Sequence, residues 1–169
     1  MNRYLPSCSR GFSLIEVLVT LLLTSIGILG MVAMQAKAIA YTQDSIQRNA
    51  AAMLADELME IMRADTNNVL TVNGRPRESS GYYKTSGSFP EAADDCSSLP
   101  NDPAGRLGCW AAHASQVLPG ASELLNSEFH IKPIGSTIEI QLAWSVAAGG
   151  CLDGNDAGTV CHYRLRAEL

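Results

Sequence analysis

An uninterrupted apolar run near the N-terminus constrains the fold of this chain more than any other feature. From Val17 to Ala36, twenty consecutive residues carry no charge. A helix rises about 1.5 Å per residue, so as a helix this run spans about 30 Å, the hydrocarbon thickness of a bilayer. A secretory signal peptide has a shorter apolar segment and a small-residue cleavage site, and the run shows neither. It therefore predicts a membrane-spanning helix, with a buried helix of a soluble protein as the alternative.

The charges that flank this run predict its orientation. Arg3 and Arg10 precede it, whereas Lys37, Asp44 and Arg48 follow it with mixed sign. Positive charge stays on the cytoplasmic side of a membrane span. We therefore expect the N-terminus in the cytoplasm and everything after about residue 37 outside it.

The cysteines support this orientation. Cys8 precedes the span, and four cysteines follow it: Cys96, Cys109, Cys151 and Cys161. Four cysteines allow three pairings, of which the local pairs 96–109 and 151–161 are the simplest. A zinc site that also uses His113 or His162 is the alternative. The lack of a C-x-x-C pair and the oxidising compartment disfavour it, so we expect disulfides and no metal.

Charge and composition exclude two classes of protein. The formal net charge is -5, and no Lys/Arg cluster follows Arg10, so we expect no nucleic-acid partner. Hydrophobic residues make up 47% of the chain, which excludes a disordered protein.

The helical pattern continues beyond the apolar run. No Gly or Pro occurs between Met31 and Val72, and "ADTNN" supplies residues that end a helix. We predict one continuous helix from about residue 13 to residue 63, apolar in its first half and amphipathic in its second. A stripe at helical spacing is expected to form core, and it comprises Ile46, Ala50, Met53, Leu54, Leu58, Ile61 and Met62.

The sequence pattern after residue 64 predicts a small domain that contains both helix and strands. Residues 65–102 are polar and rich in Gly, Ser, Asn and Pro, which is typical of loop, with short strand pieces near Tyr82 and Tyr83. Asp102-Pro103 begins a predicted helix that Pro119-Gly120 ends. Strict alternation in "STIEIQLAWSV" predicts a strand, with "FHIKPI" before it and "CHYRLRAEL" after it as partners. We expect an α+β fold in which a small antiparallel sheet packs on the amphipathic helix.

No motif predicts catalysis. The sequence has no nucleophile elbow, phosphate loop or H-E-x-x-H, so we expect neither an enzyme nor a cofactor. The segment "DGNDAG" from Asp153 is weakly similar to a calcium loop, but Arg164 occupies the twelfth position, where such a loop has an acid. A plain turn is the simpler interpretation, and calcium binding near Asp153 stays open.

A short motif at the start of the apolar run resembles the type IV prepilin signal. It comprises the Gly11-Phe12 junction and Glu16, the fifth residue counting from Phe12. The resemblance implies cleavage after Gly11, removal of a leader that includes Cys8, and methylation of the new amine of Phe12. Glu16 would neutralise the amine of a neighbouring subunit in the dry filament core, where an unpaired charge is costly. An acid favoured by the helix dipole is the alternative, but it requires no such junction.

Two longer stretches narrow the resemblance. "SIGILGMVAMQ" and "RNAAAMLADELMEIMRA" are similar to minor pilins of the family known as type IV pilus modification protein PilV, as is the Trp110 helix that ends in "LPG". Major pilins usually carry a proline where this chain has Ala33. The resemblance implies a minor pilin that primes pilus assembly near the tip. Its partners would be other minor pilins, the major pilin, a tip adhesin, the prepilin peptidase and the inner-membrane assembly platform. The I-type pseudopilin of a type II secretion system is the alternative.

The same resemblance implies a division of the chain. Residues 1–11 would be the cleaved leader, 12–36 the membrane and filament-core helix, 37–64 its amphipathic half, and 65–169 a periplasmic globular domain. The protein would sit in the inner membrane before assembly and in a surface pilus after it. The loop at 73–102 is expected to contact a partner or a surface, because loops often carry binding.

Overall fold

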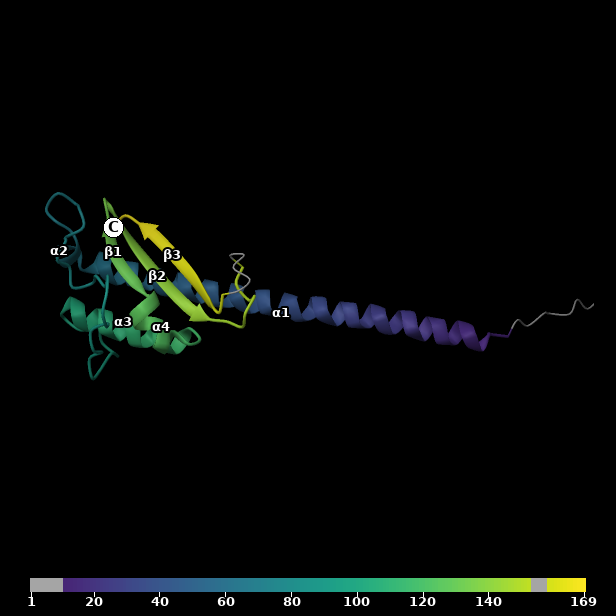
Figure 1. The fold of residues 1–169 in the computed structure, drawn as a ribbon. Coiled ribbons are helices and arrows are strands. Elements are labelled where there is room, and N and C mark those ends of the chain that lie inside the picture. Colours follow the sequence, from purple (N-terminus) through teal and green to yellow (C-terminus); the bar gives the residue numbers. More distant parts are fainter. Residues whose placement is uncertain (1–10, 153–157) are drawn as a thin grey trace, which may run out of the picture. The chain divides into compact units, whose positions relative to one another are not determined.

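The computed structural model describes residues 11–152 and 158–169. Helix α1 (Leu14–Ala64) is followed by the short α2 (Thr66–Val69), α3 (Pro103–Val117) and α4 (Ala121–Glu128). Three strands complete the chain: β1 (His130–Ile134), β2 (Thr137–Ser145) and β3 (Val160–Ala167) (Figure 1). A long N-terminal helix and a small antiparallel sheet confirm the predicted α+β, pilin-like architecture.

The chain divides into two compact units, Met1–Ile39 and Ala40–Leu169. In the described part of the first unit, almost every side chain from Gly11 to Ile39 is exposed, including the large apolar ones. Helix α1 is the one helix within the described ranges that is long and apolar enough to cross a membrane. The hydroxyls of Thr20, Thr24 and Ser25 donate to carbonyls one turn earlier, at 2.7–3.0 Å. These hydroxyls are therefore satisfied within the helix, as an apolar solvent requires.

The sheet in the second unit has the order β1-β2-β3, and both pairs are antiparallel. Ile140 at the centre of β2 lies opposite Ile131 of β1 and Leu165 of β3. The alternating residues predicted to face the core include Ile138, Ile140, Leu142 and Trp144, and all four are buried. The residues between them are buried as well, so β2 is covered on both faces and not on one alone. Gly135 turns the chain between β1 and β2 with φ at 64°, a conformation that suits glycine.

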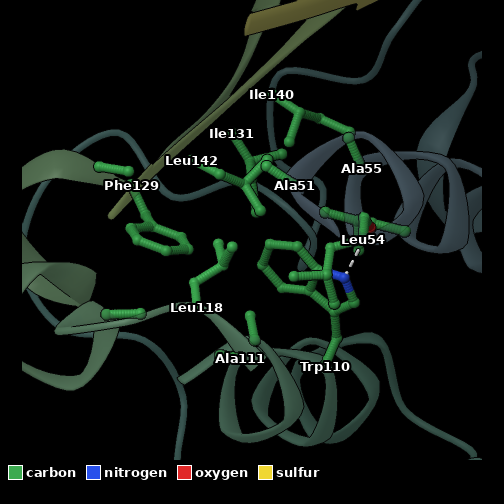
Figure 2. Packing of buried hydrophobic residues seen from close by; sticks show 14 of the residues in the cluster. Ala51, Leu54, Ala55, Trp110, Ala111, Leu118, Phe129, Ile131, Ile140 and Leu142 are labelled. Atoms are coloured by element: carbon green, nitrogen blue, oxygen red, sulfur yellow. Dashed lines mark hydrogen bonds between the residues drawn. The ribbon is translucent and has the colours of Figure 1, made fainter. Parts of the chain in front are cut away.

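The core forms where the C-terminal part of α1, helix α3 and the sheet meet (Figure 2). Trp110 of α3 lies almost completely buried in it, and its indole Nε1 donates a 2.9 Å hydrogen bond to the backbone oxygen of Leu54. A buried indole N–H needs such a partner, so this bond sets the position of α3 against α1.

The predicted apolar stripe on α1 is only partly correct. Leu54, Leu58 and Met62 are buried as expected, but Ile46 is 59% exposed and Met53 is 73% exposed. The buried stripe instead includes Ala51, Ala55 and Met59. A residue advances about 100° around a helix, so Met53 lies about 200° from both Ala51 and Ala55, on the opposite face. Ile46 shares that opposite face because it is seven residues, or nearly two turns, from Met53.

Local signals explain where the shorter helices begin and end. The Asp102 carboxylate accepts a 2.7 Å hydrogen bond from the N–H of Gly105, and Pro103 occupies the first helical position, as predicted for α3. Helix α4 was not predicted. Gly120 precedes it with φ at 67°, and the buried Lys84 ammonium donates to three carbonyls around its end, at 2.7–3.2 Å.

Candidate functional site

The predicted processing site lies at an open position before α1. Gly11 precedes the helix, and a Cβ added to it would meet no atom within 4 Å. The Phe12 side chain is 83% exposed. The Gly11–Phe12 junction therefore lies before the first helical residue and is accessible.

Glu16 lies in the first turn of α1, where the N–H of Glu16 bonds to the carbonyl of Ser13 at 3.0 Å. Its side chain is exposed on an apolar helix, and no ion pair involves it within residues 11–152 and 158–169. A carboxylate near the positive end of a helix dipole is locally favoured. On a surface this apolar it is also free to pair with a cation from another chain.

The family model for the prokaryotic N-terminal methylation motif matches residues 6–32, which include Gly11, Phe12 and Glu16. The chain carries a prepilin-type signal. This signal indicates a type IV pilin-like or pseudopilin-like protein, a structural protein rather than an enzyme. It implies processing by prepilin peptidase and assembly into a pilus-like filament, and with the apolar first half of α1 it fits an anchor in the inner membrane. No curated protein and no solved structure matches the chain.

The roles of the individual residues stay predictions. Cleavage after Gly11, methylation of Phe12 and subunit pairing through Glu16 follow from the signal and not from any contact within the described residues. The three positions lie within six consecutive residues, so a single N-terminal segment would carry processing and pairing.

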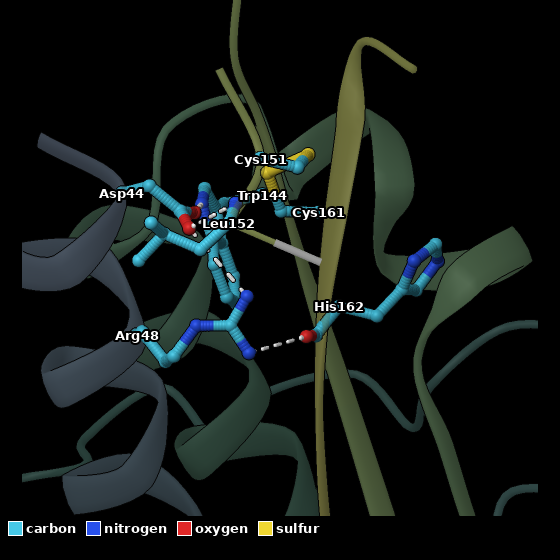
Figure 3. Close-up of a disulfide and its surroundings, with 7 residues drawn as sticks. All are labelled: Asp44, Arg48, Trp144, Cys151, Leu152, Cys161 and His162. Carbon is cyan, nitrogen blue, oxygen red and sulfur yellow. Dashed lines mark hydrogen bonds and ion pairs between the residues drawn. A yellow bond between two sulfur atoms is a disulfide. The ribbon is translucent and has the colours of Figure 1, made fainter. Parts of the chain in front are cut away.

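A second group of residues, missed by sequence reasoning, holds the globular unit to its helix. We call it the Asp44 cluster, and it comprises Asp44, Arg48, Trp144 and Leu152 (Figure 3). The fully buried Asp44 carboxylate accepts hydrogen bonds from Trp144 Nε1 at 3.0 Å and from the backbone N–H of Leu152 at 3.0 Å. Arg48 lies 3.5 Å from the same carboxylate. A buried charge persists only when it is paired and hydrogen-bonded in this way.

Arg48 extends the Asp44 cluster to the edge strand. Its guanidinium lies 5.5 Å from the centre of the Trp144 ring and donates a 3.4 Å hydrogen bond to the backbone oxygen of His162 in β3. The cluster therefore joins α1 to both β2 and β3. From sequence, Asp44 and Arg48 are only a surface pair four residues apart on a helix, because nothing local indicates an indole 100 positions later.

The four outer cysteines form two disulfides, Cys96–Cys109 and Cys151–Cys161, with a Cα–Cα distance of 5.6 Å in each. The first fastens the loop before α3 to that helix, and the second joins the connection between β2 and β3 to the start of β3. Cysteines in disulfides have no thiolate to bind zinc.

Tyr82, Asp65 and Arg106 form a hydrogen-bonded group at the N-terminal end of α3. The Tyr82 hydroxyl donates to Asp65 at 2.9 Å and accepts from Arg106 at 3.2 Å, and Arg106 lies 3.1 Å from Asp65. Burial is the main cause that raises the pKa of Tyr82 from 10.0 to about 12. Burial also raises the pKa of the neighbouring Tyr83. These phenols are therefore held neutral and structural rather than poised to lose a proton.

Glu139 on β2 is buried between two cations on the neighbouring strands. Lys132 of β1 lies 3.0 Å from its carboxylate and Arg166 of β3 lies 2.5 Å from it. Burial raises the pKa of Glu139, but hydrogen bonds and charge from Arg166 and Lys132 outweigh it, so the pKa is lowered. The charged row therefore links all three strands of the sheet.

The described residues contain no group of three His, Cys, Asp or Glu placed to hold a metal ion. His113 instead lies 3.3 Å from Glu57, and His162 lies 3.0 Å from Glu128. The segment from Asp153, considered for calcium, begins outside the described residues.

Proposed function

We propose that this protein is a minor pilin that primes type IV pilus assembly and is incorporated into the pilus, near the tip, with other minor pilins. The observation that carries the proposal is the prepilin-type signal on an exposed apolar helix that leads into a separate, disulfide-bonded globular unit. A filament subunit needs each of these parts. The signal directs processing, the helix packs in the filament, and the globular unit faces outward.

Two sequence features favour a minor pilin that pairs with further subunits. Ala33 stands where major pilins usually have proline, which favours a minor subunit. Glu16 is retained and exposed, so this subunit has the acid needed to neutralise a neighbouring subunit's amine inside an apolar filament. The tipmost member of such a complex often lacks that acid, so we place this chain just below it.

The test is the amount of major pilin sheared from cells that lack the gene, compared with cells complemented by the wild-type gene. We expect a sharp fall on deletion, recovery with the wild type and no recovery with Glu16→Ala. Glu123→Ala is the matched control, because Glu123 is also an exposed acid in the first turn of a helix but belongs to the globular unit. It should restore pili fully. Unchanged pilus yield after deletion would overturn the priming role.

The alternative is an I-type pseudopilin, which shares the N-terminal pattern. The same deletion strain distinguishes the two. Loss of exported enzymes from the medium, with normal pilus yield, would assign the chain to a secretion system instead.

A further inference from the structure

An open groove lies in the globular unit, away from the Asp44 cluster. It has a volume of about 840 Å³ and lies between the last turns of α1, the outer side of α3 and the loop before α3. Six of its lining residues carry the argument, and together we call their site the acidic groove: Glu57, Glu60, Asp94, Leu99, Arg106 and Trp110. Its size is within the range of sites that bind ligands or side chains of partners.

The wall of the acidic groove is held in place. The disulfide Cys96–Cys109 joins the loop to α3, and both cysteines line the groove. Gly108 lets the loop approach the helix closely, because a Cβ at this position would lie 2.5 Å from the backbone oxygen of Glu91. The groove therefore exists before any partner arrives, which reduces the entropy lost on binding.

The chemistry of the acidic groove selects a basic and apolar partner. Glu57, Glu60 and Asp94 contribute three carboxylates, of which Glu60 pairs with the exposed Arg63 and Glu57 lies 3.3 Å from His113. Arg106 is a cation that also lines the groove. Asp65, 3.1 Å from Arg106, already balances that cation. Its apolar lining includes the Leu99 side chain, which is 60% exposed, and the buried Trp110.

The same chain presents a complementary loop at residues 70–77, which we call the basic loop. Its tip carries Val72, which is fully exposed, and two exposed arginines follow, Arg75 and Arg77. Two backbone hydrogen bonds close the loop: Thr71 N donates to Arg75 O at 2.7 Å, and Arg77 N donates to Val69 O at 2.7 Å.

We propose that the basic loop of one copy docks into the acidic groove of a second copy. No residue of the basic loop lines the groove of its own chain. In Figure 1 the loop after α2 and the loop before α3 extend to opposite sides of the C-terminal end of α1. A contact between them is therefore heterologous, and each dimer keeps one free groove and one free loop for further copies. The contact does not depend on which filament the protein serves.

A charge exchange tests the contact. Two full-length copies with different tags are co-expressed and solubilised in detergent, and the fraction that copurifies is measured. Arg75→Glu in both copies, or Glu60→Arg in both copies, should lower that fraction about tenfold, because like charges then face each other. A mixture of one Arg75→Glu copy and one Glu60→Arg copy should recover it. Glu123→Arg, which changes the charge equally but outside the groove, should have no effect.

Engineered cysteines test the register without changing these charges. Val72→Cys in one copy and Leu99→Cys in the other, each with Cys8→Ser, should form a disulfide-linked dimer in oxidised membranes. Val72→Cys with Ser127→Cys, an exposed position on α4, should not. Equal cross-linking of both pairs, or a Leu99→Cys adduct with another protein only, would overturn self-docking. Pilus yield is a separate readout, so the contact can fail while the priming role holds, and the reverse.

Discussion

The indole Nε1 of Trp144 donates a 3.0 Å hydrogen bond to the Asp44 carboxylate, which is fully buried although it belongs to the most exposed helix of the chain. Asp44 lies four residues after the globular unit begins at Ala40. The bond thus fixes β2 to α1 close to the start of that unit. The backbone N–H of Leu152, in the segment that connects β2 to β3, donates to the same carboxylate and so fixes this segment to α1 as well.

Asp44→Asn should destabilise the globular unit by about 2 kcal/mol, because an amide has one acceptor oxygen for two buried N–H donors and no charge for Arg48. Thermal unfolding of the full chain in detergent, followed by tryptophan fluorescence, measures this, since Trp110 and Trp144 are both buried. Asp56→Asn on an exposed position of α1 is the control. Equal midpoints for both variants would show that the Asp44 cluster contributes nothing.

Replacing Cys151 and Cys161 together by Ala should lower the free energy of unfolding by about 2.5 kcal/mol, because the unfolded chain is no longer closed into a loop of 10 residues. The loss should be larger still because both side chains are buried. The double variant Cys96→Ala, Cys109→Ala should lose mainly the stabilisation that comes from closing the loop, since Cys96 is exposed and little burial is lost there. Denaturant unfolding of the two double variants compares them. A larger loss from the 96–109 pair would contradict this order.

Tyr82→Phe should make stability less sensitive to alkaline pH. The pKa of Tyr82 is about 12 in the folded protein against 10.0 normally, so the unfolded state loses the proton first. The stability from this group is present below pH 10.0 and is lost as the pH rises through about 12. The free energy of unfolding, measured across this window, should fall more steeply for the wild type than for the variant. Tyr83 and Lys84 titrate equally in both proteins, so parallel slopes would refute the assignment.

Gly11→Val should block removal of the leader. A side chain at this position is compatible with the open segment but would occupy the place that a peptidase needs for a glycine. Intact-mass measurement should give the chain from Phe12 with one added methyl group for the wild type, and the full-length, unmethylated chain for the variant. A wild-type chain that begins at Met1 in cells with an active prepilin peptidase would contradict the prediction.

The local sequence determined much of this protein because several of its signals are periodic or positional. The uncharged run predicted the exposed apolar helix, alternation from Thr137 predicted β2, and the Asp102-Pro103 pair predicted the start of α3. Gly11, Phe12 and Glu16 predicted the prepilin-type signal for the same reason, since a peptidase reads a short linear motif.

The tertiary structure alone decided which side of α1 became core and which acids were buried. Periodicity gave an apolar stripe through Ile46 and Met53, but both are exposed, because small residues such as Ala51 and Ala55 let the sheet and α3 approach the other face. Asp44 is a charged residue that the sequence alone would leave at the surface, but its position against β2 buries it completely. The acidic groove likewise needs α1, α3 and a disulfide-held loop in one place. A linear pattern records the preferences of each residue, whereas burial and grooves depend on which distant segments pack together, and that is settled only when the chain folds.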